Sequence, residues 1–418
     1  MWLTKTTRRQ KNPVRITTLL RRLIGVTSLL VRSVAFEGGD LVLGVEPRWR
    51  RPRCGACEKR APGYDQSPAR RWRQLGLGRL RIWLAYAPRR VRCPRCGVRT
   101  EQVPWAEAGS RFTKDFEEMV AYLTRATDKT QVTRLMGISW RTVGEVVERV
   151  VGRKQDPERL SNLRWIGVDE FSHRKGQRYL TLVVDHVKRR VVWAAEGKDS
   201  ATLRKFFEEL GPEKAAEIEG ITTDLAGWNL KAIEEHIPQA EVVFDRFHVQ
   251  KLASDALEKV RREQLRGTRG TPEGKFIFRS RYALLKNYRD LSKSQKQKLI
   301  EIEKANKPLF RAYMLKETLA AALDYRQPKR AEDALREWLA WASRSRLQPF
   351  VKAGRTIRKH FDGILAYIKG RMSNGLVEGI NNRMRMVARR AFGFHGAGAL
   401  IALLFLCCGG IQLDPRLP

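Results

Sequence analysis

Acidic side chains that follow apolar, strand-like stretches are the residues of this sequence best placed to do chemistry. Asp169 follows the stretch WIGV, and Asp224 follows the stretch GITT. A third acid, Glu378, lies in a much later helical segment. Carboxylate oxygens are the hard ligands that Mg²⁺ prefers, and two such ions can clamp the attacking and leaving oxygens of a phosphodiester displacement. These three acids therefore predict a site for two Mg²⁺ ions, or for Mn²⁺.

Each acid taken alone also has a structural interpretation, as a turn cap, as the start of the LAGW turn, or as an ion-pair partner of Arg385. Glu170 is the rival of Asp169, but neighbours in a strand point to opposite faces, so only one of them can face the site. Asp245 also ends an apolar strand and competes with Asp224 for the role of second ligand. We rank it second because its strand is expected to lie farther from the first.

Polar residues near these acids are candidates for supporting roles. His248 is interpreted either as a core histidine bonded to a backbone carbonyl or as a group that orients a phosphate. Glu378, Asn382 and Arg385 follow one another at spacings of four and three, which places them on one stripe of a helix. Two cations that follow the first acid are expected to approach DNA phosphates: Arg174 and Lys175.

Two Cys-x-x-Cys pairs occur in the N-terminal part of the chain. They are Cys54 with Cys57 and Cys93 with Cys96. A two-residue gap lets both sulfurs of a pair face one ion, so the four thiolates predict a tetrahedral zinc site. The loop between the pairs is longer than the spacing of about 15 to 20 in the usual motif. A closed site of four thiolates has no open position for catalysis, so this zinc is expected to be structural.

The elements that must position the acids form a recognisable series. Strands are expected over 164–171, 179–185 and 191–195, followed by a helix capped by Ser200, a strand ending at Asp224, a second helix and a fifth strand leading to Asp245. Three strands, helix, strand, helix, strand is the order of the ribonuclease H-like fold. More than a hundred helical residues then follow, before the segment that contains Glu378.

A helix-turn-helix precedes these strands. Apolar residues at helical spacing predict three short helices between residues 112 and 150. Gly137 would reverse the chain between the last two, and Ser139 would cap the third. The outer face of that third helix is expected to meet DNA through three residues: Arg141, Thr142 and Arg149. Small three-helix bundles also occur without DNA, so the charge of the chain decides in favour of this interpretation.

Composition points to a polyanionic partner. The chain has 418 residues, 82 Lys and Arg against 45 Asp and Glu, and a formal net charge of +37. Such a field suits nucleic acid, and double-stranded DNA is the expected partner. No export signal is evident, and the apolar stretch at 399–408 is shorter than the roughly 20 residues of a membrane helix. We expect a cytoplasmic protein with no membrane association, and the family resemblance described next implies a bacterial, nucleoid-associated one.

Four stretches together resemble a known family. VDEF with RKG, TTDLAGW, VVFDRFHV and SNGLVEGINNRMR are similar to the DDE transposases of bacterial insertion sequences, and specifically to the ISL-three family. The resemblance implies that Asp169, Asp224 and Glu378 are the catalytic acids, and that Asp245 with His248 supports the core. Arg385 stands where the family leads us to expect Lys, which keeps the charge and the reach to phosphate.

The family also implies a domain organisation and an activity. The α+β multidomain chain would contain, in order, a basic zinc-ribbon region (1–106), a helix-turn-helix (107–155), the first part of a ribonuclease H-like catalytic domain (160–253), an all-α insertion (254–371) and the final catalytic helices (372–418). It would bind terminal inverted repeats, cleave the transposon ends by metal-activated hydrolysis and join the 3′ hydroxyl to target DNA, as a homodimer or higher oligomer on DNA. The alternatives are a regulator without catalytic activity and a structure-specific nuclease.

Overall fold

The computed structural model describes residues 16–26, 28–174, 178–225, 227–268, 270–370, 375–390 and 396–415. The chain divides into two compact units. The first contains the chain up to Lys154 with short pieces near the C-terminus, and the second contains Gln155–Arg389 and Gly393–Ile411. Both helices and sheets are present, so the predicted mixture of α and β structure is confirmed.

The first unit begins with a helix and a sheet that the sequence did not predict. Helix α1 (Ile16–Ile24) precedes a four-stranded sheet whose order is β1 (Leu29–Glu37), β2 (Asp40–Pro47), β5 (Leu80–Tyr86) and β4 (Arg70–Leu77). Trp105 is buried in its core, with its ring edge-on to Trp72 and Tyr86 at centroid distances of 5.6 Å. Strand β1 is mostly exposed, so it lacks the apolar alternation that predicts a half-buried strand.

A second, smaller sheet and three helices complete this unit. The sheet has the order β3 (Gly63–Gln66), β6 (Arg89–Cys93) and β7 (Gly97–Thr100). The helices are α2 (Lys114–Ala126), α3 (Lys129–Met136) and α4 (Trp140–Lys154), which confirms the three predicted helices. Gly137 ends α3 in the left-handed conformation, with φ 57°. The Ser139 hydroxyl accepts a hydrogen bond from the Thr142 backbone N–H at 3.2 Å, so the predicted cap is also confirmed.

The second unit contains a five-stranded sheet in the predicted order of elements. The strands are β8 (Trp165–Arg174), β9 (Arg178–Asp185), β10 (Arg190–Glu196), β11 (Gly220–Thr223) and β12 (Glu241–Phe244), and their spatial order is β10-β9-β8-β11-β12. The first three form an antiparallel meander, while β11 is parallel to both β8 and β12. The connections are α5 (Ser200–Leu210), a short helix α6 (Pro212–Ala216) that was not predicted, and α7 (Gly227–His236). The N-cap of α5 is Asp199, which accepts from the Thr202 backbone N–H at 2.7 Å, so the predicted cap by Ser200 is wrong.

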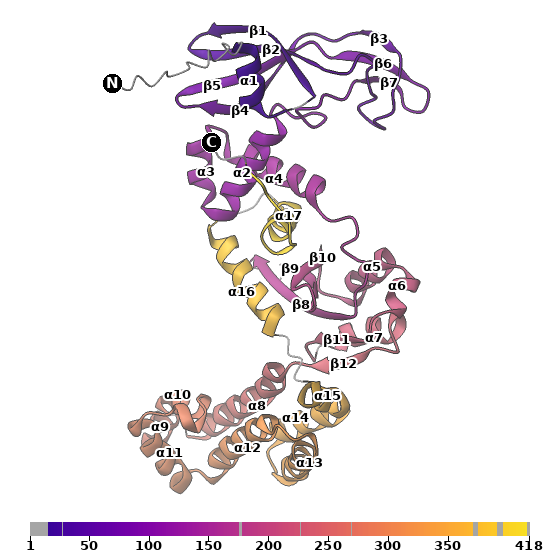
Figure 1. Ribbon diagram of the computed structural model, residues 1–418. Coiled ribbons are helices and arrows are strands. Elements are labelled where there is room, and N and C mark those ends of the chain that lie inside the picture. The colour runs from indigo at the N-terminus through magenta and orange to yellow at the C-terminus, as the bar shows by residue number, and fades with distance from the viewer. Residues whose placement is uncertain are drawn as a thin grey trace, which may run out of the picture. The chain divides into compact units, whose positions relative to one another are not determined.

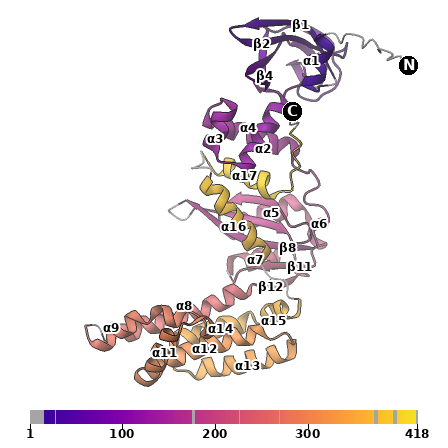
Figure 2. The same ribbon diagram turned by 60° about the vertical axis from the view of Figure 1, so that its left-hand side comes forward.

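Helices cover both faces of this sheet. Ile166 and Val168 share a buried cluster with Leu203 and Phe206 of α5 and with residues of α7. The alternate position, Gly167, faces Val377 of α16 (Gly375–Arg390), which lies along β8 (Figures 1 and 2). Helix α17 (Ala397–Cys408) contacts β10 and is largely buried, as its apolar sequence predicts. No helix among the described residues is long and apolar enough to cross a membrane.

The chain from Arg246 to Gly370 is helical, as predicted. Its helices are α8 (Arg246–Gly267), α9 (Pro272–Arg279), α10 (Arg281–Leu285), the 3₁₀ turn η1 (Tyr288–Asp290), α11 (Lys293–Ala305), α12 (Lys307–Asp324), α13 (Pro328–Arg344), α14 (Gln348–Lys359) and α15 (Phe361–Gly370). They share one apolar core, in which Trp338 is 1% exposed. The segment ends beside the sheet, because Gly363 of α15 lies against Phe244 of β12.

Candidate functional site

Three aspartates lie at the edge where the parallel pairing of three neighbouring strands ends: Asp224 and Asp245 follow β11 and β12, whereas Asp169 lies within β8, two residues beyond its last pair with β11. Thr222 of β11 pairs with Gly167 of β8, and Thr223 pairs with Phe244 of β12. Continuing this register by one or two residues brings Asp224 beside Asp169 on one side and beside Asp245 on the other. The carboxyl ends of parallel strands are the usual place for a ligand in such a sheet. The structure therefore brings the first two predicted acids together, and it adds Asp245 to the same edge.

Asp169 is largely buried, and its neighbours shift the pKa of its carboxyl in opposite directions. Burial raises the pKa of its carboxyl above the usual range, and the negative charges of Asp224 and Asp245 act in the same direction. The backbone N–H of Glu170 donates to Asp169 Oδ1 at 2.7 Å, and this hydrogen bond and the charge of His248 both lower the pKa. The charges of Asp224, Asp245 and His248 are thus close enough to shift the pKa of Asp169, as expected for groups that share a site.

Glu170 points to the opposite face of the sheet, as strand alternation predicts. Its side chain is 7% exposed, and its Oε2 lies 3.7 Å from Nζ of Lys198. Burial raises its pKa to about 7, and the charge of Asp224 adds to the rise while Lys198 opposes it. The side chain of Asn229 of α7 also lowers the pKa of Glu170. Glu170 is therefore a second buried acid beside Asp169, on the other face of the sheet, and the sequence interpretation treated it only as a rival of Asp169.

Asp245 has a structural role that is visible in its contacts. Its side chain accepts a hydrogen bond from the Phe247 backbone N–H at 2.9 Å and caps the N-terminus of α8. His248 lies on the first turn of the same helix, with its ring edge-on to Phe247. The cap uses one lone pair of Asp245, and the choice of Asp224 over Asp245 as the second ligand stays a prediction.

Helix α16 reaches the sheet through a close contact at Gly167. A Cβ atom on Gly167 would lie 2.6 Å from Cγ2 of Val377, which is fully buried. One turn later, Nδ2 of Asn381 donates to Oδ2 of Asp169 at 2.7 Å. The sequence interpretation missed Asn381. The signal that could have found it is its position four residues after the buried Val377, on the same face of the helix.

The other residues predicted on α16 lie on its exposed side. Glu378 is on the first turn and is exposed. Asn382 is also exposed, and its Oδ1 accepts a hydrogen bond from Nη1 of Arg385 at 2.8 Å. Among the described residues, the four cysteines are the only group of three or more His, Cys, Asp or Glu whose ligand atoms all lie within 4.8 Å of one another. Glu378 is therefore not gathered with the two aspartates at that spacing.

Two predicted phosphate contacts fall at the β8–β9 connection. Arg174 is the last residue of β8 and pairs with Arg178 of β9 through the backbone. Nothing further is described of its side chain, and Lys175 lies outside the described residues. Their predicted contact with DNA stays a prediction.

The oxygen atoms around the aspartates fit a divalent cation. Asn229, which is 0% exposed, donates through Nδ2 to Asp224 Oδ1 at 3.2 Å and to Thr223 Oγ1 at 3.0 Å. Within the part of the chain that the structure describes, the buried atoms without a hydrogen-bond partner include Asn229 Oδ1, Asn381 Oδ1 and Glu170 Oε1. Buried oxygens in this state are costly unless water or an ion meets them. Carboxylates with unpaired neutral oxygens form the donor set of a hard cation.

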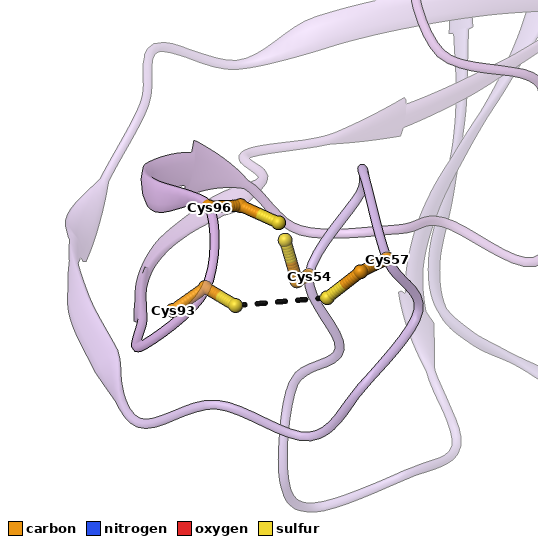
Figure 3. A group of neighbouring side chains, drawn as sticks. All are labelled: Cys54, Cys57, Cys93 and Cys96. Carbon is orange, nitrogen blue, oxygen red and sulfur yellow. Dashed lines mark hydrogen bonds between the residues drawn. The ribbon is translucent and has the colours of Figure 1, made fainter.

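The four cysteines form a metal-ligand set in the first unit (Figure 3). Cys54 and Cys57 come from the loop before β3, whereas Cys93 ends β6 and Cys96 immediately precedes β7. The sulfurs of Cys57 and Cys93 are 3.6 Å apart, close to the spacing of about 3.8 Å between two ligands of a tetrahedral ion with 2.3 Å bonds. The backbone N–H groups of Arg95 and Cys96 lower the pKa of Cys93 to about 7, which favours its thiolate.

The third helix of the helical bundle presents two of its three predicted DNA contacts. Arg141 is 79% exposed and pairs with Glu145 at 2.9 Å, and Thr142 is partly exposed. Arg149 is instead engaged within the unit, because its Nε donates to Oε1 of the fully buried Glu117 at 2.7 Å. Its guanidinium therefore neutralises a core carboxylate, and we leave it out of the proposed DNA contacts.

Comparisons with known proteins agree with this arrangement. Residues 166–404 match a family model described as "Transposase", of the DDE and ISL3 type, and residues 101–151 match the "Helix-turn-helix domain of transposase family ISL3". The class of the protein is therefore that of the transposases. The chain is 37% identical over 432 residues to the "Transposase for insertion sequence element IS1557" of Mycobacterium tuberculosis, covering 96% of this chain and 97% of that relative.

A second relative extends the agreement to another organism. The "Transposase for insertion sequence element IS1001" of Bordetella parapertussis is 31% identical over 362 residues, which cover 86% of this chain and 89% of the relative. The chain belongs to the ISL-three (ISL3) family of insertion-sequence transposases.

Proposed function

We propose that the protein binds the terminal inverted repeats of an insertion sequence, cleaves the element's ends and joins the freed 3′ hydroxyl to target DNA. The observation that carries this proposal is the shared register of Asp169 and Asp224 where the parallel pairing of β8 and β11 ends, with the helix of Glu378 packed on β8. The strand order β10-β9-β8-β11-β12 is that expected of a ribonuclease H-like domain.

Some residues of the second unit would bind the cations, and others would contact DNA. Asp169, Asp224 and Glu378 would hold two Mg²⁺ ions, or Mn²⁺, which supply charge stabilisation to the attacking and leaving oxygens of an in-line displacement. Glu378 lies about 60° around the helix from Asn381, so its carboxylate belongs to the side of α16 next to the one that faces Asp169. Arg385, exposed two turns later, is positioned to contact a phosphate.

The first unit would supply recognition of the DNA ends. The four cysteines would hold a structural Zn²⁺ ion, and Arg141 with Thr142 would enter the DNA groove from the helix-turn-helix. A formal net charge of +37 would strengthen the approach to DNA at low salt. Joining two element ends requires at least a dimer on DNA, and the site of action would be the bacterial nucleoid.

The test is an incubation of end-bearing duplex DNA with Mg²⁺ and a target plasmid. Joined products support transposition. Nicked DNA without joined products would instead identify a structure-specific nuclease, and a shifted but intact duplex would identify a regulator without catalytic activity. Asp169→Asn serves as the matched inactive variant, because it keeps the shape of the side chain and removes the charge that holds the cation.

A further inference from the structure

Asn381 fixes the orientation of the first aspartate. Its side chain is 2% exposed, and its Nδ2 donates to Asp169 Oδ2 at 2.7 Å. The other carboxylate oxygen, Oδ1, accepts from the Glu170 backbone N–H at 2.7 Å. Each oxygen of Asp169 is thus held by one donor, and each oxygen has a second lone pair that can meet another ligand.

The position of Asn381 follows from the contact at Gly167. Val377 packs on Gly167, and Asn381 comes four residues later on the helix while Asp169 comes two residues later on the strand. Four helical residues advance about 6 Å, and two strand residues advance about 6.6 Å. The helix and the strand therefore advance by nearly the same distance. The Asn381 amide reaches the Asp169 carboxylate when Val377 packs on Gly167.

Asn229 repeats this arrangement at the second aspartate, from a different helix. It is 0% exposed, and its Nδ2 donates to Asp224 Oδ1 at 3.2 Å and to Thr223 Oγ1 at 3.0 Å. Within the described part of the chain, the Oδ1 atoms of both asparagines are buried without a hydrogen-bond partner. A buried amide oxygen without a partner is destabilising, so two of them at one site indicate polar groups that the described part of the chain does not provide.

We propose that Asn381 and Asn229 are positioning residues, which hold Asp169 and Asp224 in the orientation that binds divalent cations, while their Oδ1 atoms accept hydrogen bonds from water molecules at the site. This inference rests on the proposed function, in which the aspartates bind the cations. Groups that orient metal ligands in this way contribute about 10- to 100-fold to metal affinity or activity.

The test measures Mn²⁺ binding to the full-length protein without DNA, by isothermal titration calorimetry. Asn381→Leu keeps the branched shape and the number of heavy atoms of the side chain and removes its donor, and Asn381→Ala and Asn229→Ala remove donor and volume together. We expect each variant to bind Mn²⁺ about 10- to 100-fold more weakly than the unsubstituted protein. Met386→Gln is the matched control on α16, because Met386 is 63% exposed, and we expect it to leave Mn²⁺ affinity unchanged.

The thermal midpoint of unfolding separates positioning from packing. If Asn381→Leu keeps both the midpoint and the Mn²⁺ affinity of the unsubstituted protein, the positioning role is refuted. If the variants lower the midpoint but keep the affinity of the folded protein, the asparagines only pack, and the inference is equally refuted.

Asp169→Asn separates this inference from the proposed function. If it leaves Mn²⁺ affinity unchanged, the aspartate site is absent and the inference fails with it. If Mn²⁺ binding depends on Asp169, Asn381 and Asn229 while the unsubstituted protein joins no DNA, the inference stands and the proposed function fails.

Discussion

Val377 of α16 lies so close to Gly167 of β8 that no side chain fits between them, since a Cβ atom there would be 2.6 Å from Val377 Cγ2. The same atom would be 2.9 Å from His186 Nε2 and 3.0 Å from Thr222 Oγ1. Gly167 is therefore the position at which the helix of Glu378 is attached to the strand of Asp169.

Gly167→Ala is expected to destabilise the protein and to separate the helix from the sheet. Overpacking of this kind costs about 1–3 kcal/mol, and it should reduce DNA cleavage more than DNA binding. Gly379→Ala is the matched control on the same helix, because a Cβ at Gly379 meets nothing within 4 Å. Alanine there should stabilise by about 0.5–1 kcal/mol. Urea unfolding followed by circular dichroism measures both, and equal stability of the two variants would contradict this account.

Asp224→Asn and Asp245→Asn should differ sharply in cleavage. Asn keeps the ability to cap a helix, so Asp245→Asn should retain the free energy of unfolding, whereas Asp245→Ala should lose about 1 kcal/mol. Asp224→Asn removes a proposed cation ligand and should lower end cleavage at least about 100-fold at unchanged stability. Gel assays of end cleavage at saturating Mg²⁺ provide the comparison. A greater loss in Asp245→Asn than in Asp224→Asn would move the second ligand to Asp245.

The stability of the metal-free protein should depend on Glu170 between about pH 4.5 and 7. The pKa of Glu170 is raised from 4.5 to about 7, so the folded state binds more protons than the unfolded state in this window. The free energy of unfolding contributed by this group therefore falls as the pH rises, by about 3 kcal/mol in total. Glu170→Gln should remove that slope and be more stable than the unsubstituted protein above pH 7. Urea titrations in EDTA at several pH values test this, and a slope that survives the substitution would assign it to another group.

Arg141 and Arg149 should have opposite effects although they lie on the same helix. Arg141→Ala should change stability by less than about 0.5 kcal/mol and reduce the salt dependence of DNA binding by about one phosphate contact. Arg149→Ala leaves the fully buried Glu117 with one cation fewer and should cost about 3 kcal/mol. Thermal unfolding and binding isotherms at several salt concentrations separate the two effects. A stable Arg149→Ala with weakened DNA binding would restore Arg149 to the DNA interface.

Removal of the cysteine-bound metal should unfold the small sheet of the first unit. Cys93→Ser is expected to reduce the zinc content from about one ion per chain to none and to lower end binding. Cys407→Ala, which changes a buried thiol outside the cluster, should keep the zinc. Elemental analysis of the purified proteins measures the content. Zinc at full occupancy in Cys93→Ser would show that the cluster is not the site.

The order of strands could be predicted from the sequence, because the apolar runs before Asp169, Asp224 and Asp245 are short and end at polar residues. The rotation of α16 could not. Each step along a helix turns by about 100°, so the choice between Asn381 and Asn382 depends on which residue contacts the sheet. That residue is Val377. Its partner Gly167 has no side chain, so the sequence gives no apolar pattern that would predict the contact. Strand β1 was missed for another reason. Most of its residues are exposed, so its sequence lacks the alternation of apolar and polar residues that predicts a strand.

The hydrogen bond between Asn381 and Asp169 joins residues that are 212 positions apart. A ribosome that has made the DNA-recognition segments and the first two aspartates must still add the long helical stretch before it reaches Asn381 and Glu378. Closure of such a distant contact comes late in folding. Under the proposed function, a nascent or prematurely terminated chain could bind DNA but would lack the residues that cut it, so DNA cleavage would require nearly complete synthesis.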